Sequence, residues 1–280
     1  MNDKIQKFNN SSNFFQCPLC GEKLTLNGNS LTCDQNHTFD ISKKGFVDFV
    51  LNSKQQKNYD LESFENRHLI LEHGMYDHIA DKIVKLVDQL KIKSILDVGC
   101  GEGYYSKKIA EMESKDVFAF DISKDSIQLA AKGPNTPVEW FVGDLAHLPI
   151  QDQTIDGIID IFSQANYHEF NRILQPSGYV LKVIPNEYHV QELREQAKDQ
   201  LKQEKYSNQK VLDYFEEHCT LVDQIDATKT YNVTEEERTA FINMTPLLFN
   251  VDNSLIDWNQ VKQITVGSTI LVGQIKNANS

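Results

Sequence analysis

The stretch Ser94–Tyr104, which reads SILDVGCGEGY, constrains the fold more than any other part of the chain. A short apolar run is followed by glycines at alternate positions, and helix-forming residues then continue to Met112. This order predicts a buried strand, a tight turn and a helix. Because Gly99, Gly101 and Gly103 carry no Cβ, the backbone of the turn can adopt positive φ and lie directly against a ligand.

An acidic residue at the end of the next strand accompanies this turn. The spacing G-x-G-x-G is not the G-x-G-x-x-G of a dinucleotide pyrophosphate site, since Tyr104 stands where the last glycine would be. Asp97 can accept hydrogen bonds from loop amides or reach a ligand ammonium group. The strand Val117–Phe120 ends on Asp121, whose carboxylate can accept two ribose hydroxyls. The pattern predicts a nucleoside site; the alternative is a glycine-rich turn of some other α/β domain.

Strands and helices continue to alternate after this unit, as in a doubly wound α/β domain. Further strands are expected at 138–142, 157–162, 179–184, 221–225 and 266–275, the last two as an antiparallel pair. Helices are expected at 61–73, 76–90, 124–131, 167–174 and 234–241, with a charged helix from near Pro185 to about Lys205. The fold class predicted is therefore α/β.

Two loops after later strands extend the expected ligand site. Asp144 follows the third strand, where it either binds an adenine amine or is an ordinary turn aspartate. The loop Ser163–Asn166 follows the fourth strand and should border an acceptor pocket, because ligands of open α/β sheets bind beyond the carboxyl ends of the strands. Ser163 and Asn166 offer hydrogen-bond groups suited to a base edge, or else they simply cap the next helix.

Four potential metal ligands precede the α/β pattern. Cys17 and Cys20 are separated by two residues, and Cys33 and His37 follow after a further twelve. Two such thiolates can bind one face of a tetrahedral Zn²⁺, and Cys33 with His37 can complete it. A disulfide and free buried thiols are the alternatives. With all four positions filled by protein, the predicted zinc site is structural.

The region around these ligands predicts a small metal-dependent module. Lys23–Leu26 and Ser30–Thr32 should form a hairpin that turns at Asn27-Gly28. We expect a zinc-ribbon-like module at residues 1–51, too small to fold without its metal, and a larger domain at 52–280. The first sixteen residues are polar and predict a frayed tail.

Charge is distributed unevenly between these two parts. The net charge is −12 and the pI about 5.1, which ordinarily disfavours a nucleic-acid partner. Residues 1–58 carry seven Lys and five Asp or Glu, so they are mildly basic within an acidic chain. Phe39–Val50 mixes lysines with aromatics, which either stack on bases and hold phosphates or fill the core of the module.

Cysteine content and hydropathy predict the compartment. The chain has five cysteines, no apolar segment of membrane length and no signal-type leader. These features predict a protein of the reducing cytoplasm with no membrane partner.

The motifs, taken in order, resemble a known family. The glycine-rich turn with Asp121 resembles class I methyltransferases that use S-adenosylmethionine. The fuller set resembles the bacterial 23S ribosomal RNA guanine-N1 methyltransferases: Cys17–Cys20, Lys44–Val47, Arg67 with Gly74–Tyr76, Asp97–Tyr105, Asp121–Lys124, His189 and Met244–Pro246. The resemblance implies a Rossmann-like class I methyltransferase sheet with a small N-terminal zinc-ribbon domain, one structural zinc and a homodimer.

The resemblance also implies roles for individual residues. Gly99, Gly101 and Gly103 would line the methionine moiety and Asp121 would hold the ribose, while Tyr76, Glu102 and His189 would contact the cofactor. The acceptor would be a guanine in a 23S rRNA hairpin loop, unstacked for reaction. Its ring nitrogen must lose a proton, for which Asp160 and Ser163 are equal candidates.

Two other functions remain open at this stage. One is a methyltransferase of a small molecule or protein, which the acidic body fits better. The other is a non-catalytic zinc-ribbon RNA-binding factor with a vestigial cofactor fold. The chain keeps Asp97, the three glycines and Asp121, and this disfavours the non-catalytic function.

Overall fold

A computed structural model describes residues 3–50, 61–133, 136–201 and 207–276, with only the backbone for residues 61–63. The predicted linker Asn52–Asp60 and the predicted domain boundary after residue 51 lie outside the described residues.

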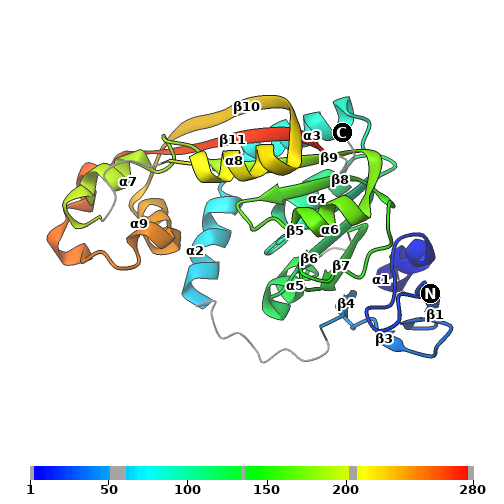
Figure 1. Ribbon diagram of the computed structural model, residues 1–280. Coiled ribbons are helices and arrows are strands. Elements are labelled where there is room, and N and C mark those ends of the chain that lie inside the picture. The colour runs from blue at the N-terminus through cyan, green and yellow to red at the C-terminus, as the bar shows by residue number, and fades with distance from the viewer. Residues whose placement is uncertain (1–2, 51–60, 134–135, 202–206, 277–280) are drawn as a thin grey trace.

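An eight-stranded mixed sheet forms the centre of the molecule (Figure 1). Its strands in spatial order are β10 (Cys219–Asn232), β11 (Gln263–Ile275), β9 (Leu174–Pro185), β8 (Ile155–Ile161), β5 (Ser94–Val98), β6 (Asp116–Asp121), β7 (Val138–Val142) and β4 (Phe46–Asp48). The strands from β9 to β4 run parallel, and β11 pairs antiparallel with both β9 and β10. The predicted α/β class and the terminal antiparallel pair are confirmed.

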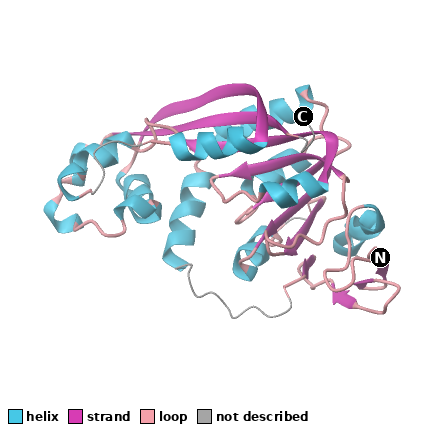
Figure 2. Ribbon diagram, viewed as in Figure 1, coloured by secondary structure: helices cyan, strands magenta, loops and turns pink. Residues whose placement is uncertain are grey.

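Helices lie on both sides of this sheet (Figure 2). The helices are α2 (Leu61–Glu72), α3 (Asp77–Gln89), α4 (Tyr104–Ala110), α5 (Lys124–Ala130), α6 (Tyr167–Ile173), α7 (Gln191–Gln196), α8 (Gln209–His218) and α9 (Glu235–Met244). Of these, α7 and α9 lie beyond one end of the sheet (Figure 1). One buried apolar cluster unites α3, α4 and α5 with the sheet, and a second unites α6 and α8 with it. The sheet is therefore covered on both faces, as its run of buried apolar strands requires.

The helix expected from Pro185 to about Lys205 is much shorter than predicted. The helix α7 spans Gln191–Gln196, and a 3₁₀ turn follows at Lys198–Gln200. The side chain of Asn186 accepts a hydrogen bond from the amide of Tyr188, and Val190 takes a φ of 46°. This local turn delays the helix because a residue with positive φ cannot continue a right-handed helix.

The strand β9 also begins earlier than expected. The sequence predicts this strand at 179–184, but β9 runs from Leu174 to Pro185 and includes Pro176–Gly178. The pairing with β8 changes register between Ile155 and Gly157, which absorbs the extra residues.

The prediction of a frayed N-terminal tail is wrong. The segment forms α1 (Asp3–Gln6) and the 3₁₀ helix η1 (Lys7–Asn13). Phe8 and Phe15 are fully buried, and the rings of Phe14 and Phe15 lie 4.6 and 5.6 Å from that of Phe118 in β6. Burial of two aromatic rings and partial burial of a third, that of Phe14, outweigh the polar composition of the segment.

The predicted hairpin is confirmed as part of a small three-stranded sheet. Its strands are β1 (Thr25–Asn27), β2 (Ser30–Thr32) and β3 (Thr38–Asp40). The next strand, β4, leaves this small sheet and pairs with β7 at the edge of the large one. Phe39, Phe46 and Phe49 are buried, so they fill the core and are not free to stack on bases.

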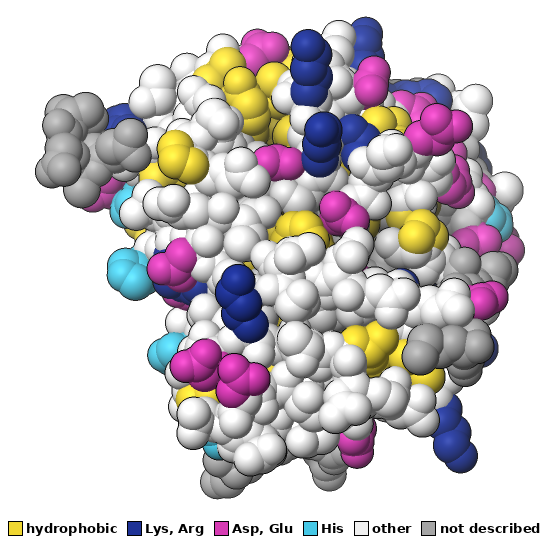
Figure 3. Space-filling model, turned by 90° about the vertical axis from the view of Figure 1, so that its right-hand side faces the viewer, with side chains coloured by type: hydrophobic (Ala, Val, Ile, Leu, Met, Phe, Trp, Pro, Cys, Tyr) yellow, Lys and Arg dark blue, Asp and Glu magenta, His cyan; other side chains and the backbone are white. Residues whose placement is uncertain are grey.

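The surface next to the N-terminus carries charges of both signs. Figure 3 shows the side of the molecule on which the N-terminus lies in Figure 1. Several Lys and Arg side chains lie close together near the top of this face, with Asp and Glu side chains around them, and others lie apart lower down. Among the described residues, no helix has the length and apolar character needed to span a bilayer.

Candidate functional site

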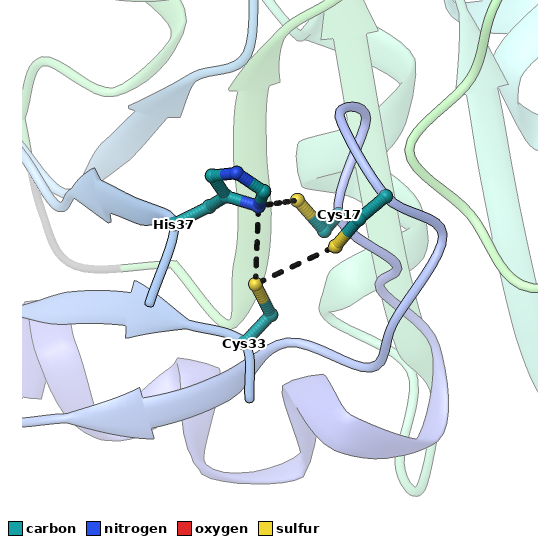
Figure 4. Close-up of side chains that lie close together, drawn as sticks. Cys17, Cys33 and His37 are labelled. Carbon is teal, nitrogen blue, oxygen red and sulfur yellow. Dashed lines mark hydrogen bonds between the residues drawn. The ribbon is translucent and has the colours of Figure 1, made fainter. Parts of the chain in front are cut away.

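Four side chains of the N-terminal module converge on one point. The ligand atoms of Cys17, Cys20, Cys33 and His37 all lie within 4.8 Å of one another. Nδ1 of His37 is 3.5 Å from Sγ of both Cys17 and Cys33, and Sγ of Cys20 is 3.6 Å from Sγ of Cys33 (Figure 4). A tetrahedral zinc with bonds of about 2.3 and 2.1 Å has edges of about 3.8 and 3.6 Å. The arrangement therefore fits Zn²⁺.

The same distances decide against a disulfide. Bonded sulfurs lie about 2.05 Å apart, and all five cysteines are free. Two tight turns aim the thiols inward: the Gly21 amide donates to the Cys17 carbonyl, and the Asn36 amide donates to that of Cys33. Gly21 adopts a φ of 77°, a conformation that glycine takes without strain.

The glycine-rich turn adopts the predicted backbone. Gly99, Gly101 and Gly103 have φ values of 66°, 57° and 77°. A Cβ on Gly103 would lie 2.3 Å from the Trp140 ring, and one on Gly99 would lie 2.9 Å from Cβ of Ser163. Close packing therefore requires glycine at both positions, in addition to any ligand.

The two strand-end carboxylates are held differently. Asp97 is 2% exposed and accepts a hydrogen bond of 2.5 Å from Ser106 Oγ in α4. Burial raises the pKa of Asp97 to about 7. Asp121 accepts the amide N–H of Gly101 (3.0 Å) and of Ser123 (2.8 Å) with its two oxygens. Asp121 thus joins the turn after β5 to the loop after β6.

Asp144 and Glu102 lie at the edges of the site. Asp144 is exposed and accepts the amide N–H of Ala146 at 2.9 Å, as a turn aspartate does. Glu102 lies in the glycine-rich turn, and one of its carboxylate oxygens is 2.5 Å from His68 Nδ1 in α2. Glu102 thus connects α2 to the glycine-rich turn.

A cavity of about 810 Å³ is lined by Tyr105 of α4, the helix that follows this turn, whereas Gly99–Gly103 and Asp121 are not among its lining residues. Tyr76 and His189, which lie far apart in the sequence, both line it, together with Arg67 and Phe162. The Arg67 guanidinium lies 3.7 Å from the place where a Cβ on Gly101 would sit, so it joins the turn to the cavity. A further part of the wall is the segment Ile242–Phe249 at the end of α9.

The imidazole of His189 is partly buried in this wall, with its Nδ1 atom inaccessible to solvent. Its Nδ1 has no hydrogen-bond partner among the described residues. Burial, together with the nearby Arg194, lowers the pKa of His189 to about 4. The ring is therefore neutral at physiological pH and can still bond to a ligand through Nδ1.

The predicted acceptor loop is organised by a lysine that sequence reasoning missed. Asp160 is fully buried, and Ser163 Oγ lies 2.6 Å from Asp160 Oδ1. Lys182 Nζ donates to Asp160 Oδ2 at 2.8 Å and to the carbonyl of Ser163 at 2.5 Å. A lysine inside the apolar strand Tyr179–Ile184 was the signal, since lysine is rarely buried without a partner.

The third residue predicted in this loop, Asn166, serves the backbone. Its Oδ1 accepts the amide N–H of Glu169 at 3.3 Å and caps α6, and its Nδ2 donates to the Leu145 carbonyl at 3.1 Å. Asp160 and Ser163 are thus brought together, while Asn166 is engaged by neighbouring backbone groups.

Comparison with known proteins agrees with this architecture. Residues 95–182 match a methyltransferase domain family, and residues 15–57 match a family described as RlmA, N-terminal. A chain of the complex between the Trm112 methyltransferase activator of Haloferax volcanii and a candidate methyltransferase has a TM-score of 0.50 at 16% identity. The match covers 78% of this chain and 99% of that one, and shows similarity of fold.

Two relatives are similar in sequence over much of the chain. A Bacillus subtilis protein named as a candidate 23S rRNA (guanine-N1)-methyltransferase is 32% identical over 273 residues, covering 92% of this chain and 96% of the relative. The 23S rRNA (guanine(748)-N1)-methyltransferase of Streptomyces fradiae is 24% identical over 185 residues, covering 64% and 66%. The chain belongs to the family of 23S rRNA (guanine-N1)-methyltransferases.

Proposed function

We propose that this enzyme transfers a methyl group from S-adenosylmethionine to N1 of a guanine in a hairpin loop of 23S rRNA. The observation that carries the proposal is a cavity lined by Tyr76, His189 and Arg67, whose guanidinium also lies beside Gly101 of the glycine-rich turn. The same chain bears the Cys₃His module. The names of the relatives supply the acceptor class.

The proposed cofactor site follows the order of the strands. Asp121 would hold the ribose after β6, and Asp144 would meet the adenine after β7. The methionine would lie over Gly99–Gly103 after β5, close to Tyr76, Glu102 and His189. The buried carboxylate of Asp97 would favour the cationic end of this moiety, because a nearby positive charge stabilises its ionised form.

Bound S-adenosylmethionine supplies an already activated methyl group on a sulfonium. The task of the protein is therefore to orient the acceptor and to take up a proton. Correct orientation of donor and acceptor can lower the activation free energy of transfer by about 7 kcal/mol or more. Ser163 lies between the buried Asp160 and the glycine-rich turn, so a proton from guanine N1 would reach Asp160 through the Ser163 hydroxyl.

A direct test uses 23S rRNA isolated from cells that lack the gene. Purified enzyme is incubated with this RNA and S-adenosylmethionine, and the nucleosides are analysed by mass spectrometry. We expect 1-methylguanosine to form, with a KM that rises with salt because RNA binding releases counterions. Absence of methylguanosine would reject the rRNA acceptor and favour a small-molecule or protein substrate.

Further parts of the proposal concern organisation. We propose a zinc-ribbon module at residues 1–51 that contributes to RNA recognition, and a methyltransferase domain at 52–280. A homodimer in the cytoplasm is also proposed from the family resemblance. Sedimentation of the purified protein would test the dimer, since a monomer at micromolar concentration contradicts it.

A further inference from the structure

Phe162 has an unusual conformation at the carboxyl end of β8. Its φ is 54°, in the left-handed region that residues with a Cβ rarely occupy. Its side chain is 36% exposed and lines the cavity of about 810 Å³. A strained backbone that exposes a large apolar ring in a cavity is typical of a ligand-contacting position.

Polar contacts with neighbouring strands hold the backbone conformation of Phe162. The Phe162 amide donates to the Val183 carbonyl at 3.1 Å. The next residue, Ser163, is bound through its carbonyl by Lys182 and through its hydroxyl by Asp160. Contacts with β8 and β9 thus fix the backbone at Phe162 and Ser163. Because the loop is already ordered, binding of a ligand to the ring costs little conformational entropy.

The surroundings of Phe162 are aromatic. The ring centroid of Tyr76 lies 6.1 Å away at an interplanar angle of 85°, and that of His189 lies 6.0 Å away at 32°. Because burial keeps His189 neutral, no cation or carboxylate of these neighbours competes for the ring. The exposed face of the Phe162 ring, with aromatic neighbours at its edge, offers a π-surface on which a nucleobase can stack.

The position of Phe162 indicates which base would lie there. Ser163 is adjacent to Gly99, so Phe162 stands at the methionine end of the proposed cofactor site. Asp121 and Asp144, proposed for ribose and adenine, follow β6 and β7 on the other side of β5. We propose that Phe162 stacks on the target guanine when that base leaves the RNA loop. The inference rests on the proposed function and deepens it.

The test compares Phe162→Leu with Phe162→Tyr. Leucine keeps an apolar side chain of similar size but has no π-face, whereas tyrosine keeps the ring; both meet the same backbone strain. Initial rates are measured with radiolabelled S-adenosylmethionine and 23S rRNA from cells lacking the gene. We expect Phe162→Leu to lower kcat/KM for RNA by about 10- to 100-fold and Phe162→Tyr to retain most of it.

Cofactor affinity separates stacking on guanine from other roles. By calorimetry, both variants should bind S-adenosylmethionine within about 2-fold of the parent enzyme. Equal rates for the leucine variant and the parent would overturn the inference while leaving the proposed function intact. If Phe162→Leu loses cofactor affinity to the same extent as kcat/KM, the ring contacts the cofactor and not the guanine. Failure of the parent enzyme to methylate the RNA would reject the proposed function itself.

Discussion

Lys182 and Asp160 stand opposite each other on neighbouring parallel strands and form an ion pair of 2.8 Å inside the sheet. Their side chains are 5% and 0% exposed. Lys182 also binds the carbonyl of Ser163, so the pair connects the centre of the sheet to the acceptor loop. The two charges stabilise the fold only as a unit, since each would be costly to bury alone.

Replacing one member of this pair should therefore be costly. Lys182→Met leaves the Asp160 carboxylate buried beside an apolar side chain, and we expect a loss of about 3–5 kcal/mol in the free energy of unfolding. Urea denaturation measures it. The double variant Lys182→Met with Asp160→Asn should recover part of the loss, because no charge stays buried. A single variant as stable as the parent would show that the pair contributes little.

Asp97 should make stability depend on pH. Burial raises its pKa to about 7, whereas the unfolded chain has a value of about 3.9. Between pH 4 and 7 the folded protein retains a proton that the unfolded chain has lost, so the free energy of unfolding falls as pH rises through this window. A shift of this size corresponds to roughly 4 kcal/mol.

Asp97→Asn isolates this contribution from that of other titrating groups. The variant should gain stability relative to the parent when urea titrations at pH 8 are compared with those at pH 5. A difference between variant and parent that is the same at both pH values would show that Asp97 does not titrate in this range.

Loss of one zinc ligand should empty the metal centre. Cys20→Ser leaves only three strong ligands, which bind zinc more weakly than the complete tetrahedral set. We expect elemental analysis to find one zinc per chain in the parent and almost none in the variant. Cys219→Ser removes a cysteine outside the cluster and should retain the zinc. Zinc retained by Cys20→Ser would reject this ligand set.

Local patterns made much of this architecture predictable. The strand, turn and helix from Ser94 to Ala110 depend on neighbours in sequence, since apolar residues and glycines act within a few positions. The zinc ligands were likewise predictable from spacing, because a Cys-x-x-Cys pair closes on itself in one turn.

Contacts between distant segments were not predictable in this way. The pairing of Lys182 with Asp160 depends on the register of two strands, which sequence patterns leave open. The docking of Phe14 and Phe15 on Phe118 depends on how the N-terminal segment meets the sheet, and the average polarity of that segment conceals it. The positive φ of Phe162 likewise results from tertiary contacts.

Asp121 has a structural role within the protein that bears on its proposed role with ligand. Both of its oxygens accept backbone amides, one from the turn after β5 and one from the loop after β6. Asp121→Ala should therefore weaken S-adenosylmethionine binding by about 1–3 kcal/mol, through loss of the ribose contact and of the turn that presents it.

Calorimetry with adenosine alone separates the two causes of weaker binding, since loss of the ribose contact weakens the binding of adenosine and of S-adenosylmethionine equally. Asp88→Ala is the control, because this exposed carboxylate of α3 lies outside the proposed cofactor site; it should leave the affinity unchanged. Unaltered affinity in Asp121→Ala would remove Asp121 from the cofactor site.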